Sequence, residues 1–226
     1  MAKFVGVGVA RQLARGVGGH FSSAILNLSV ILGTAIPFVL GIPYDGAASA
    51  RKGAKEAPGR LRYWSQHLTP FSEDRTRLRG MRVCDLGDME VTDQVRDFDE
   101  IRKRIASLPS VPIVLGGDHS ITIPVLQGQR DRFRDRRLGL LWLDAHPDLC
   151  DEFTGSKLSH ACVLRRGLEA GIRPEDVCMV GLRSWEDQEI ELIEAGKLHV
   201  FTAAQVARDG MRAVTARVHK ALAGKL

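Results

Sequence analysis

Short, continuous apolar runs alternate with longer segments of helical periodicity from Pro37 to the end of the chain. The runs are rich in leucine and β-branched residues and do not alternate between apolar and polar positions. Strands of this kind are typical of parallel sheets that helices cover on both faces. We therefore expect strands over residues 38–42, 82–86, 111–115, 138–143, 177–180 and 198–201.

Apolar residues at three- and four-residue spacing predict helices between these strands. One helix spans residues 95–108 and ends before Pro109. Another ends at Gly196, and the last runs over residues 203–223. The alternation of strands and helices predicts an α/β fold, a three-layer, doubly wound sandwich built on a mainly parallel sheet.

The first 36 residues form a partly apolar N-terminal extension. No charged side chain occurs between His20 and Asp45, and the segment 24–42 is nearly long enough to span a membrane. Polar residues, glycine and proline interrupt this segment, and prolines bound its last part, 37–43. A short buried strand therefore explains that last part better than a membrane anchor does, and we expect no membrane partner.

The charge of the chain is positive but small. Lysine and arginine number 32 against 27 aspartate and glutamate residues, which gives a formal net charge of +5. Basic and acidic residues are interleaved in the segment 130–137, which we interpret as a solvated helix face. Aromatic residues make up 6% of the chain, too few for the stacking platforms of single-stranded nucleic-acid binders. We therefore expect no nucleic-acid partner.

The cysteines Cys84, Cys150, Cys162 and Cys178 form neither a C-x-x-C pair nor a zinc-ribbon spacing. Such isolated cysteines in or beside apolar runs are typical of small buried side chains in a reducing compartment. We predict buried thiols rather than disulfides, in agreement with a cytoplasmic location.

Two polar motifs directly follow predicted strands, at the edge where open parallel sheets bind ligands. The strand over 111–115 leads into Gly-Gly-Asp-His-Ser at 116–120. The strand over 138–143 leads into Asp-Ala-His-Pro-Asp at 144–148. The two glycines allow the backbone to pass closely under a site, and His119 can supply an imidazole ligand.

The second motif carries three potential metal ligands. Asp144, His146 and Asp148 are alternate residues, so an extended backbone would place their side chains on one face. Carboxylates and imidazoles without a thiol suit a hard or borderline cation such as Mn²⁺ better than a structural zinc. Alone, His119 would be interpreted as a hydrogen-bonded core histidine, and an aspartate at a strand end as a turn cap. Together, four such groups without a cation would concentrate charge beside the core, which is costly, so the set favours a metal site.

These two motifs resemble the first two signature motifs of the ureohydrolases, the family of arginases, agmatinases and formimidoylglutamases. Residues 41–45 are similar to the first strand and substrate loop of the family, residues 159–161 to its catalytic histidine loop, and residues 180–184 to its next strand. The resemblance covers residues 37–226, and its detail is most similar to the agmatinase branch.

The resemblance implies an arginase-like fold and a site with two Mn²⁺ ions. His119, Asp144 and Asp148 would bind one ion, and His146 with a bridging Asp144 would bind the other. The two ions would lower the pKa of a bridging water, and the resulting hydroxide would attack a guanidino substrate such as agmatine and release urea and an amine. His160 would transfer the proton to the departing amine. The resemblance also implies a homo-oligomer.

One family motif does not occur in this sequence. The third signature, S-x-D-x-D-x-x-D-P, would follow the last predicted helix and complete both metal shells. In the family, the last two strands lie between the strands that carry the two motifs found here. We therefore expect residues 37–226 to be a C-terminally incomplete ureohydrolase-type domain that lacks its last two strands. The alternative is a catalytically impaired or non-catalytic ureohydrolase-like protein or fragment that acts as a metal-binding or assembly partner.

Overall fold

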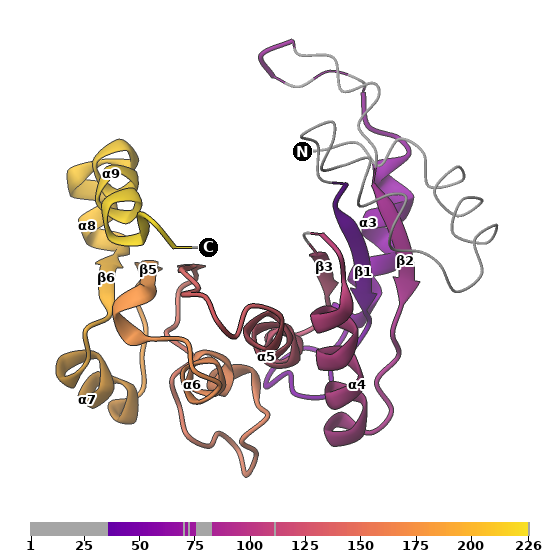
Figure 1. Cartoon of the computed structure of the whole chain (residues 1–226), viewed down its shortest axis with the longest axis horizontal. Helices are drawn as coiled ribbons and strands as arrows, with labels where there is room; N and C mark the ends of the chain where they lie inside the picture. The colour runs from indigo at the N-terminus through magenta and orange to yellow at the C-terminus, as the bar shows by residue number, and fades with distance from the viewer. Residues whose placement is uncertain (1–35, 70, 72, 76–82, 111, 226) are drawn as a thin grey trace. The chain divides into compact units, whose positions relative to one another are not determined.

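The computed structural model describes residues 36–69, 71, 73–75, 83–110 and 112–225 (Figure 1). The predicted N-terminal extension therefore lies outside the described residues, except for Ile36. The described chain divides into two compact units. The first contains the residues up to Asp97 and Ser107–Asp118, and the second contains Phe98–Ala106 and the residues from His119 onward.

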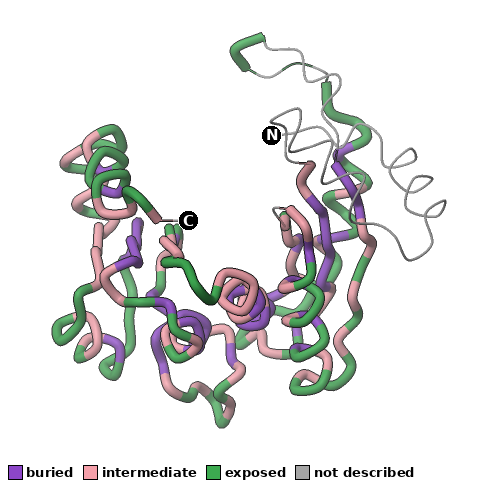
Figure 2. The backbone as a smooth tube through the Cα atoms, in the orientation of Figure 1, coloured by how far each residue is buried: buried purple, intermediate pink, exposed green. Residues whose placement is uncertain are grey.

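The first unit is built on a parallel sheet of three strands in the order β2-β1-β3. All five residues of the central strand β1 are buried, as the continuous apolar run predicted (Figure 2). Val39, Val83 and Leu115 form the hydrophobic core of this sheet. The strands are β1 (Phe38–Ile42), β2 (Cys84–Asp88) and β3 (Pro112–Gly116), and the short helix η1 (Ala54–Glu56) leads into α3 (Ala57–Ser65).

Arg62 joins α3 to the end of β2. Its Nε donates a hydrogen bond to Asp85 Oδ2 at 2.8 Å, and its Nη2 donates to the carbonyl of Gly87 at 3.0 Å. A further ion pair joins Arg62 to Asp88. Because an arginine with several charge-assisted bonds is held in one orientation, this contact fixes the helix against the sheet.

Gly117 lies against the backbone of Tyr44. The amide of Gly117 donates to the carbonyl of Ile42 at 3.2 Å, and the next amide, that of Asp118, donates to the carbonyl of Tyr44 at 2.7 Å. A Cβ at position 117 would lie 1.7 Å from the Tyr44 carbonyl oxygen. Gly117 therefore permits a close approach between two backbone segments of the first unit, which is one part of what the sequence predicted for the two glycines.

Gly117→Ala is expected to lower the free energy of unfolding by about 2 kcal/mol or more, because the backbone of one of the two segments must move. Urea unfolding measures this change. Gly59→Ala in α3 is the matched control, since a Cβ there meets nothing within 4 Å. It should stabilise the helix by about 0.5–1 kcal/mol. Equal effects of the two substitutions would contradict the close approach at Gly117.

The second unit contains a second parallel sheet of three strands, in the order β4-β5-β6. The strands are β4 (Leu140–Leu143), β5 (Val177–Leu182) and β6 (His199–Thr202). The helices are α5 (Thr122–Arg132), α6 (Val163–Glu169), α7 (Asp187–Ala195), α8 (Ala203–Asp209) and α9 (Met211–Leu222), with the short helices η2 (His119–Ile121), η3 (His160–Cys162) and η4 (Pro174–Asp176). The helix α4 (Gln94–Ser107) has residues in both units.

The central strand β5 is buried on both faces. Cys178 and Val180 on one face pack against Val214 and Val218 of α9. On α4, which belongs to this unit over 98–106, the buried residues repeat at helical spacing, as the sequence predicted. All four cysteines are buried and none forms a disulfide, which confirms that expectation.

The edge strands β3 and β4 are not covered on both faces, which agrees with the expectation for a domain without the two strands that lie between them in the family. In β4, Trp142 is buried, but the residues Leu141 and Leu143 on the opposite face are 46% and 70% exposed. In β3, Ile113 is 37% exposed. The described strands form two three-stranded sheets rather than one sheet. The strand β3 lies at the edge of the first sheet and β4 at the edge of the second.

Two helix predictions need correction. The last predicted helix is broken into α8 and α9 at Gly210, whose φ of 79° lies in the left-handed region that favours glycine. The segment 130–137 is not one helix face, because α5 ends at Arg132 and a loop follows. Within the part of the chain that the structure describes, no helix combines the length and apolar character needed to cross a membrane.

Arg137 and Asp176 form an ion pair between the segments that lead into β4 and β5. The guanidinium donates to both carboxylate oxygens, at 2.9 and 2.5 Å, and Lys225 Nζ lies 3.2 Å from one of them. The Asp176 side chain is 1% exposed. Burial raises the pKa of Asp176, but the bonds from Arg137 and Lys225 outweigh it and hold the pKa below its usual value.

Asp176→Asn is therefore expected to lower the free energy of unfolding by about 2 kcal/mol near neutral pH. The pKa of Asp176 is lower in the folded protein than in the unfolded chain, where it is about 3.9. Its ionised form therefore stabilises the protein at pH values above about 3.9, and this stabilisation is lost as the pH falls through the folded-state pKa. Urea unfolding at several pH values should therefore show that the free energies of unfolding of wild type and variant become more similar below about pH 4. The exposed Asp99→Asn in α4 is the control, and its effect should stay within about 0.5 kcal/mol. A difference that is constant with pH would contradict this account.

Candidate metal centre

The candidate site lies in the second unit, where the chain leaves β4. The strand ends at Leu143, and the residues that follow bend instead of continuing the strand. Asp148 has a φ of 54°, which is left-handed and uncommon for a residue other than glycine. The prediction of an extended backbone over residues 144–148 is therefore wrong, because bends bring these side chains together.

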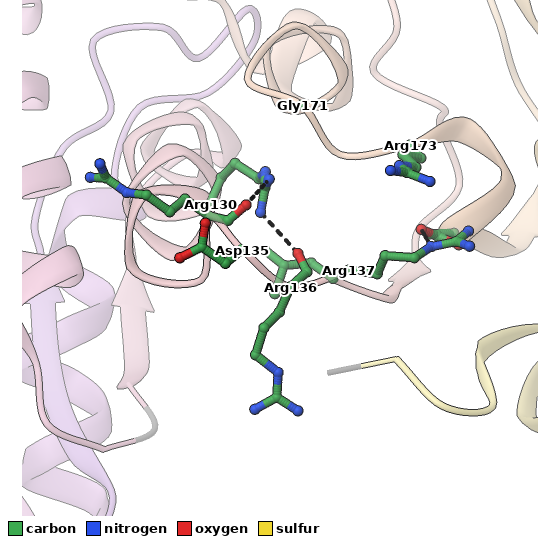
Figure 3. Close-up of a pocket in the computed structure, with 9 residues that line it drawn as sticks. Arg130, Asp135, Arg136, Arg137, Gly171 and Arg173 are labelled. Atoms are coloured by element: carbon green, nitrogen blue, oxygen red, sulfur yellow. Dashed lines mark hydrogen bonds and ion pairs between the residues drawn. The ribbon is translucent and has the colours of Figure 1, made fainter.

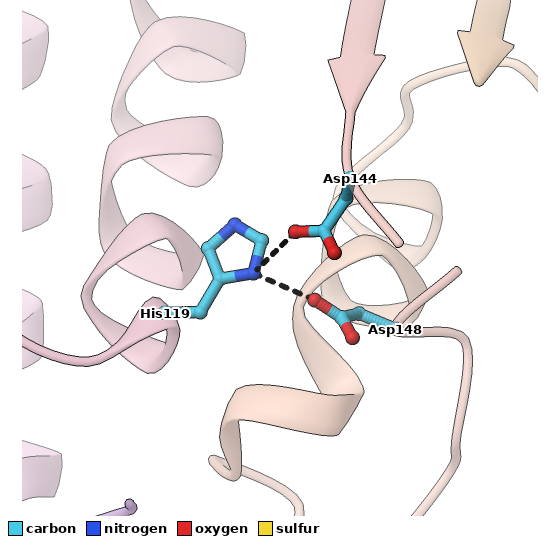
Figure 4. Close-up of side chains that lie close together, drawn as sticks. All are labelled: His119, Asp144 and Asp148. Carbon is cyan, nitrogen blue, oxygen red and sulfur yellow. Dashed lines mark ion pairs between the residues drawn. The ribbon is translucent and has the colours of Figure 1, made fainter. Parts of the chain in front are cut away.

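His119, Asp144 and Asp148 form a compact cluster of possible metal ligands (Figure 4). One ligand atom from each residue lies within 4.8 Å of the others. His119 Nδ1 is 2.7 Å from Asp148 Oδ2 and 3.5 Å from Asp144 Oδ2. The structure thus brings together residues that the sequence predicted on two separate motifs.

His146 lies on the other side of the Asp144 carboxylate. Its Nδ1 is 3.4 Å from Asp144 Oδ1, whereas His119 faces Asp144 Oδ2. The His146 side chain is 59% exposed and does not belong to the three-residue cluster. The Asp144 carboxylate therefore has one imidazole beside each of its oxygens.

The backbone of Asp148 is held by the first turn of α6. Its carbonyl accepts hydrogen bonds from the amides of Leu164 at 2.9 Å and Arg165 at 3.2 Å. A left-handed backbone at a non-glycine residue is unfavourable and persists where its surroundings enforce it. These two bonds are part of that enforcement.

Glu189 also holds the segment that carries Asp148, and the sequence did not predict this contact. Its Oε1 accepts a bond from the amide of Leu149 at 2.8 Å, and its Oε2 accepts one from the amide of Glu186 at 2.7 Å. Glu189 is buried, and burial raises the pKa of its carboxyl. The spacing of Glu186 and Glu189 is that of a capping box, which could have predicted the bond within α7. The bond to Leu149, 40 residues away, has no local sequence signal.

Trp142 orients two parts of the site and was also not predicted. Its ring stacks on the ring of His119, with 4.8 Å between centroids and 27° between planes. Its Nε1 donates to the carbonyl of His146 at 3.0 Å. A buried tryptophan two residues before Asp144 therefore restrains both histidines.

His160 lies outside the three-residue cluster, at the start of η3. Its Nδ1 is 3.3 Å from Ser159 Oγ, and its ring meets the edge of Phe153 at 5.5 Å between centroids. Its half-buried side chain is thus oriented by a hydroxyl and an aromatic ring. Its catalytic role stays a prediction.

Two further acidic residues near the motifs have structural contacts. In the first unit, Asp118 Oδ2 accepts a bond from the amide of Ala47 at 2.9 Å. In the second unit, Asp151 pairs with Arg166 at 2.7 Å and with Lys157 at 3.2 Å. These pairs hold the pKa of Asp151 below its usual value. Asp151 is therefore engaged in ion pairs with two basic residues.

The cluster places two carboxylates close together, and one of them is buried. Burial raises the pKa of Asp148, and the hydrogen bond from His119 opposes that effect. The Asp148 side chain is 6% exposed and lies close to a second carboxylate, that of Asp144. Two neighbouring carboxylates and an imidazole, without a thiol, are a donor set that fits a hard or borderline divalent cation.

This chain is similar to known proteins. A family model described as Arginase family matches residues 37–225. The guanidino acid hydrolase, mitochondrial, of Homo sapiens is 34% identical over 152 residues, which are 64% of this chain and 43% of that protein. The agmatinase of Pyrococcus horikoshii is 31% identical over 159 residues, 67% of this chain and 53% of that protein. The chain spans about half the length of the curated relatives that it matches.

Solved structures agree with the fold. The agmatine ureohydrolase of Thermoplasma volcanium aligns with a TM-score of 0.74 and 26% identity, over 92% of this chain and 70% of that one. The formimidoylglutamase of Bacillus subtilis aligns with a TM-score of 0.76 over 83% and 61% of the two chains, and its 22% identity supports the fold alone. The predicted arginase-like α/β fold is confirmed, and agmatinases are among the relatives. The chain belongs to the arginase family.

Proposed function

We propose that this chain carries the metal-binding residues of a hydrolase that releases urea and an amine from a guanidino compound. The observation that carries the proposal is the cluster of His119, Asp144 and Asp148 in a chain of the arginase family. Such a cluster concentrates negative charge at one point of the site, which a divalent cation would balance.

The proposed cofactor is Mn²⁺, with two ions in the complete site. His119, Asp144 and Asp148 would hold one ion, and His146 with the second oxygen of Asp144 would hold the other. One imidazole lies beside each oxygen of Asp144, which supports the assignment of His119 to one ion and His146 to the other. When bound, such ions supply a water of lowered pKa as nucleophile at neutral pH.

The residues of the chain would position the reactants. Trp142 keeps the His119 ring in a fixed plane by stacking on it. His160 would transfer a proton to the departing amine, a role that histidine side chains commonly perform in catalysis. The contacts of His160 with Ser159 and Phe153 support a fixed ring orientation, which proton transfer requires.

The substrate class is proposed from the relatives. Their names specify guanidino acids, guanidinobutyrate and agmatine, which share a guanidino group and differ in the charge of the tail. We therefore propose a guanidino group as the reacting part, with an agmatine-like amine tail as the first candidate. A homo-oligomer is proposed from the family resemblance, and a cytoplasmic location from the four buried cysteines without a disulfide.

A second candidate function is metal binding or assembly without catalysis. The three-residue cluster favours it, because His119, Asp144 and Asp148 can hold one ion and His146 lies outside the cluster. This candidate predicts binding of no more than one Mn²⁺ and no urea from any guanidino compound.

The two functions are separated by measuring Mn²⁺ stoichiometry and urea release on the same preparation. The panel should contain agmatine, guanidinobutyrate and arginine, and the intact mass of the native product should be determined in parallel. Urea release that requires Mn²⁺ supports the hydrolase, and His160→Asn should then reduce kcat while Mn²⁺ binding is retained. Mn²⁺ binding at one site without urea from any panel member supports the non-catalytic function. Failure to bind Mn²⁺ at all contradicts both.

A further inference from the structure

A pocket lined by arginines lies in the second unit, at the amino ends of β4 and β5. Its volume is about 140 Å³. The lining includes five arginines and two aspartates, from the end of α5, the loop that follows it and the loop before β5. The five arginines are Arg130, Arg134, Arg136, Arg137 and Arg173 (Figure 3).

Arg130 is a fixed part of the wall. Its Nη1 donates to the carbonyls of Phe133 at 2.6 Å and Arg136 at 3.0 Å, and its Nη2 donates to the carbonyl of Arg134 at 2.6 Å. These neutral acceptors orient the guanidinium without cancelling its charge. The loop after α5 is thereby folded around a positive group.

The carboxylates of the pocket do not balance its arginines. Asp176 already has two cationic partners, since it accepts both bonds from Arg137 and lies 3.2 Å from Lys225. Among the described residues, no ion pair involves Asp135, Arg136 or Arg173. Figure 3 shows the Arg136 side chain extending away from the other labelled residues, so the cations that remain for a ligand include Arg173 and Arg130, whose acceptors are neutral.

We propose that this pocket binds a phosphate group, either as free phosphate or as the phosphate of a small molecule. Excess guanidinium charge in a concave site is the chemistry that recognises phosphate. The volume would hold about four or five waters at about 30 Å³ each, whereas pockets for whole drug-sized ligands measure about 300–1,000 Å³. One phosphate group is therefore the part of a ligand that fits.

The pocket is separate from the candidate metal centre. Arg137 and Leu138 precede β4, whereas Asp144 follows its last residue, Leu143. A four-residue strand spans about 13 Å, so the two sites lie at opposite ends of the same strand. Phosphate binding here does not depend on the proposed hydrolase function, and its test uses no activity.

The test is calorimetric titration of the full chain with inorganic phosphate, diphosphate and phenyl phosphate at constant ionic strength. Arg173→Gln should weaken binding about tenfold, because it removes a charge-assisted donor from the ligand. Arg212→Gln is the matched control. Arg212 is an exposed arginine of α9, and its replacement removes the same charge outside the pocket and should change affinity less than about twofold.

Asp135→Asn supplies a variant with the opposite expected sign. It removes a carboxylate from the pocket lining, so phosphate should bind about twofold more tightly. Tighter binding of phenyl phosphate than of phosphate would identify a small-molecule ligand, and equal or weaker binding would identify the free ion. The proposal is overturned if wild type binds none of the three at millimolar concentration. It is also overturned if Arg173→Gln, folded by circular dichroism, binds as tightly as Arg212→Gln.

Discussion

Asp148→Asn is expected to weaken Mn²⁺ binding by at least about a hundredfold, the largest effect of any single substitution in the site. The substitution removes the most buried carboxylate of the cluster and the oxygen 2.7 Å from His119 Nδ1. An amide is a poorer ligand for a hard cation than a carboxylate, because it carries no charge to balance that of the ion. Competition with a fluorescent Mn²⁺ chelator measures the change.

Asparagine is the suitable replacement because the backbone of residue 148 is left-handed. Asparagine tolerates that conformation better than other non-glycine residues, so the bonds from Leu164 and Arg165 to the carbonyl should persist. Asp187→Asn in the exposed first turn of α7 removes the same charge and should leave Mn²⁺ affinity within about twofold. Wild-type affinity in a folded Asp148→Asn protein would exclude this cluster as the binding site.

Glu189→Ala is expected to lower both the free energy of unfolding and the affinity for Mn²⁺. The buried amide of Leu149 would lose its acceptor and α7 would lose its capping box, which together should cost about 2–4 kcal/mol. Because Leu149 directly follows Asp148, the ligand would also be less firmly held. Loss of such a supporting contact typically reduces metal affinity about 10–100-fold.

Two further variants separate support of the site from general stability. Glu191→Ala, exposed on the same helix, should change neither quantity by a measurable amount. Glu189→Gln keeps one oxygen acceptor and should retain most of the Mn²⁺ affinity. If Glu189→Ala lowers the unfolding energy but binds Mn²⁺ as wild type under conditions where it is fully folded, then Glu189 stabilises α7 alone.

The pH dependence of Glu189→Gln gives an independent check. Burial raises the pKa of Glu189 in the folded protein. A raised carboxyl pKa contributes stability below the unfolded value of about 4.3, and that contribution is lost as the pH rises through the folded pKa. The free energy of unfolding of wild type, compared with that of Glu189→Gln, should therefore fall as the pH rises from about 4.3 through the folded-state pKa. Urea unfolding at several pH values measures this change.

Local patterns predicted the strands well. The run at 38–42 coincides with β1, and the runs at 111–115 and 198–201 differ from β3 and β6 by one residue. Apolar continuity was a sufficient signal because strand formation here depends on burial along a short segment. The residue types of the candidate site were also readable, since His119, Asp144 and Asp148 stand directly after strands in the sequence.

The convergence of those residues could not be predicted from spacing. Alternation suggested an extended segment, but the side chains meet because the backbone bends and Asp148 adopts a left-handed conformation. The groups that enforce that conformation come from α6 and α7, 15 or more residues away in the chain. Local sequence carries no record of such long-range bonds, so Glu189 and the stacking of Trp142 on His119 emerged only from the structure.

The exposed face of β4 has a practical consequence for anyone who prepares this protein. Leu141 and Leu143 present two apolar side chains to solvent on a strand with one neighbour among the described strands. Strands with a bare apolar edge are templates for pairing between chains. We expect self-association at this edge to limit the concentration at which the protein stays in solution. Dilution or the substitution Leu143→Lys should reduce this self-association more than substitutions that stabilise the core.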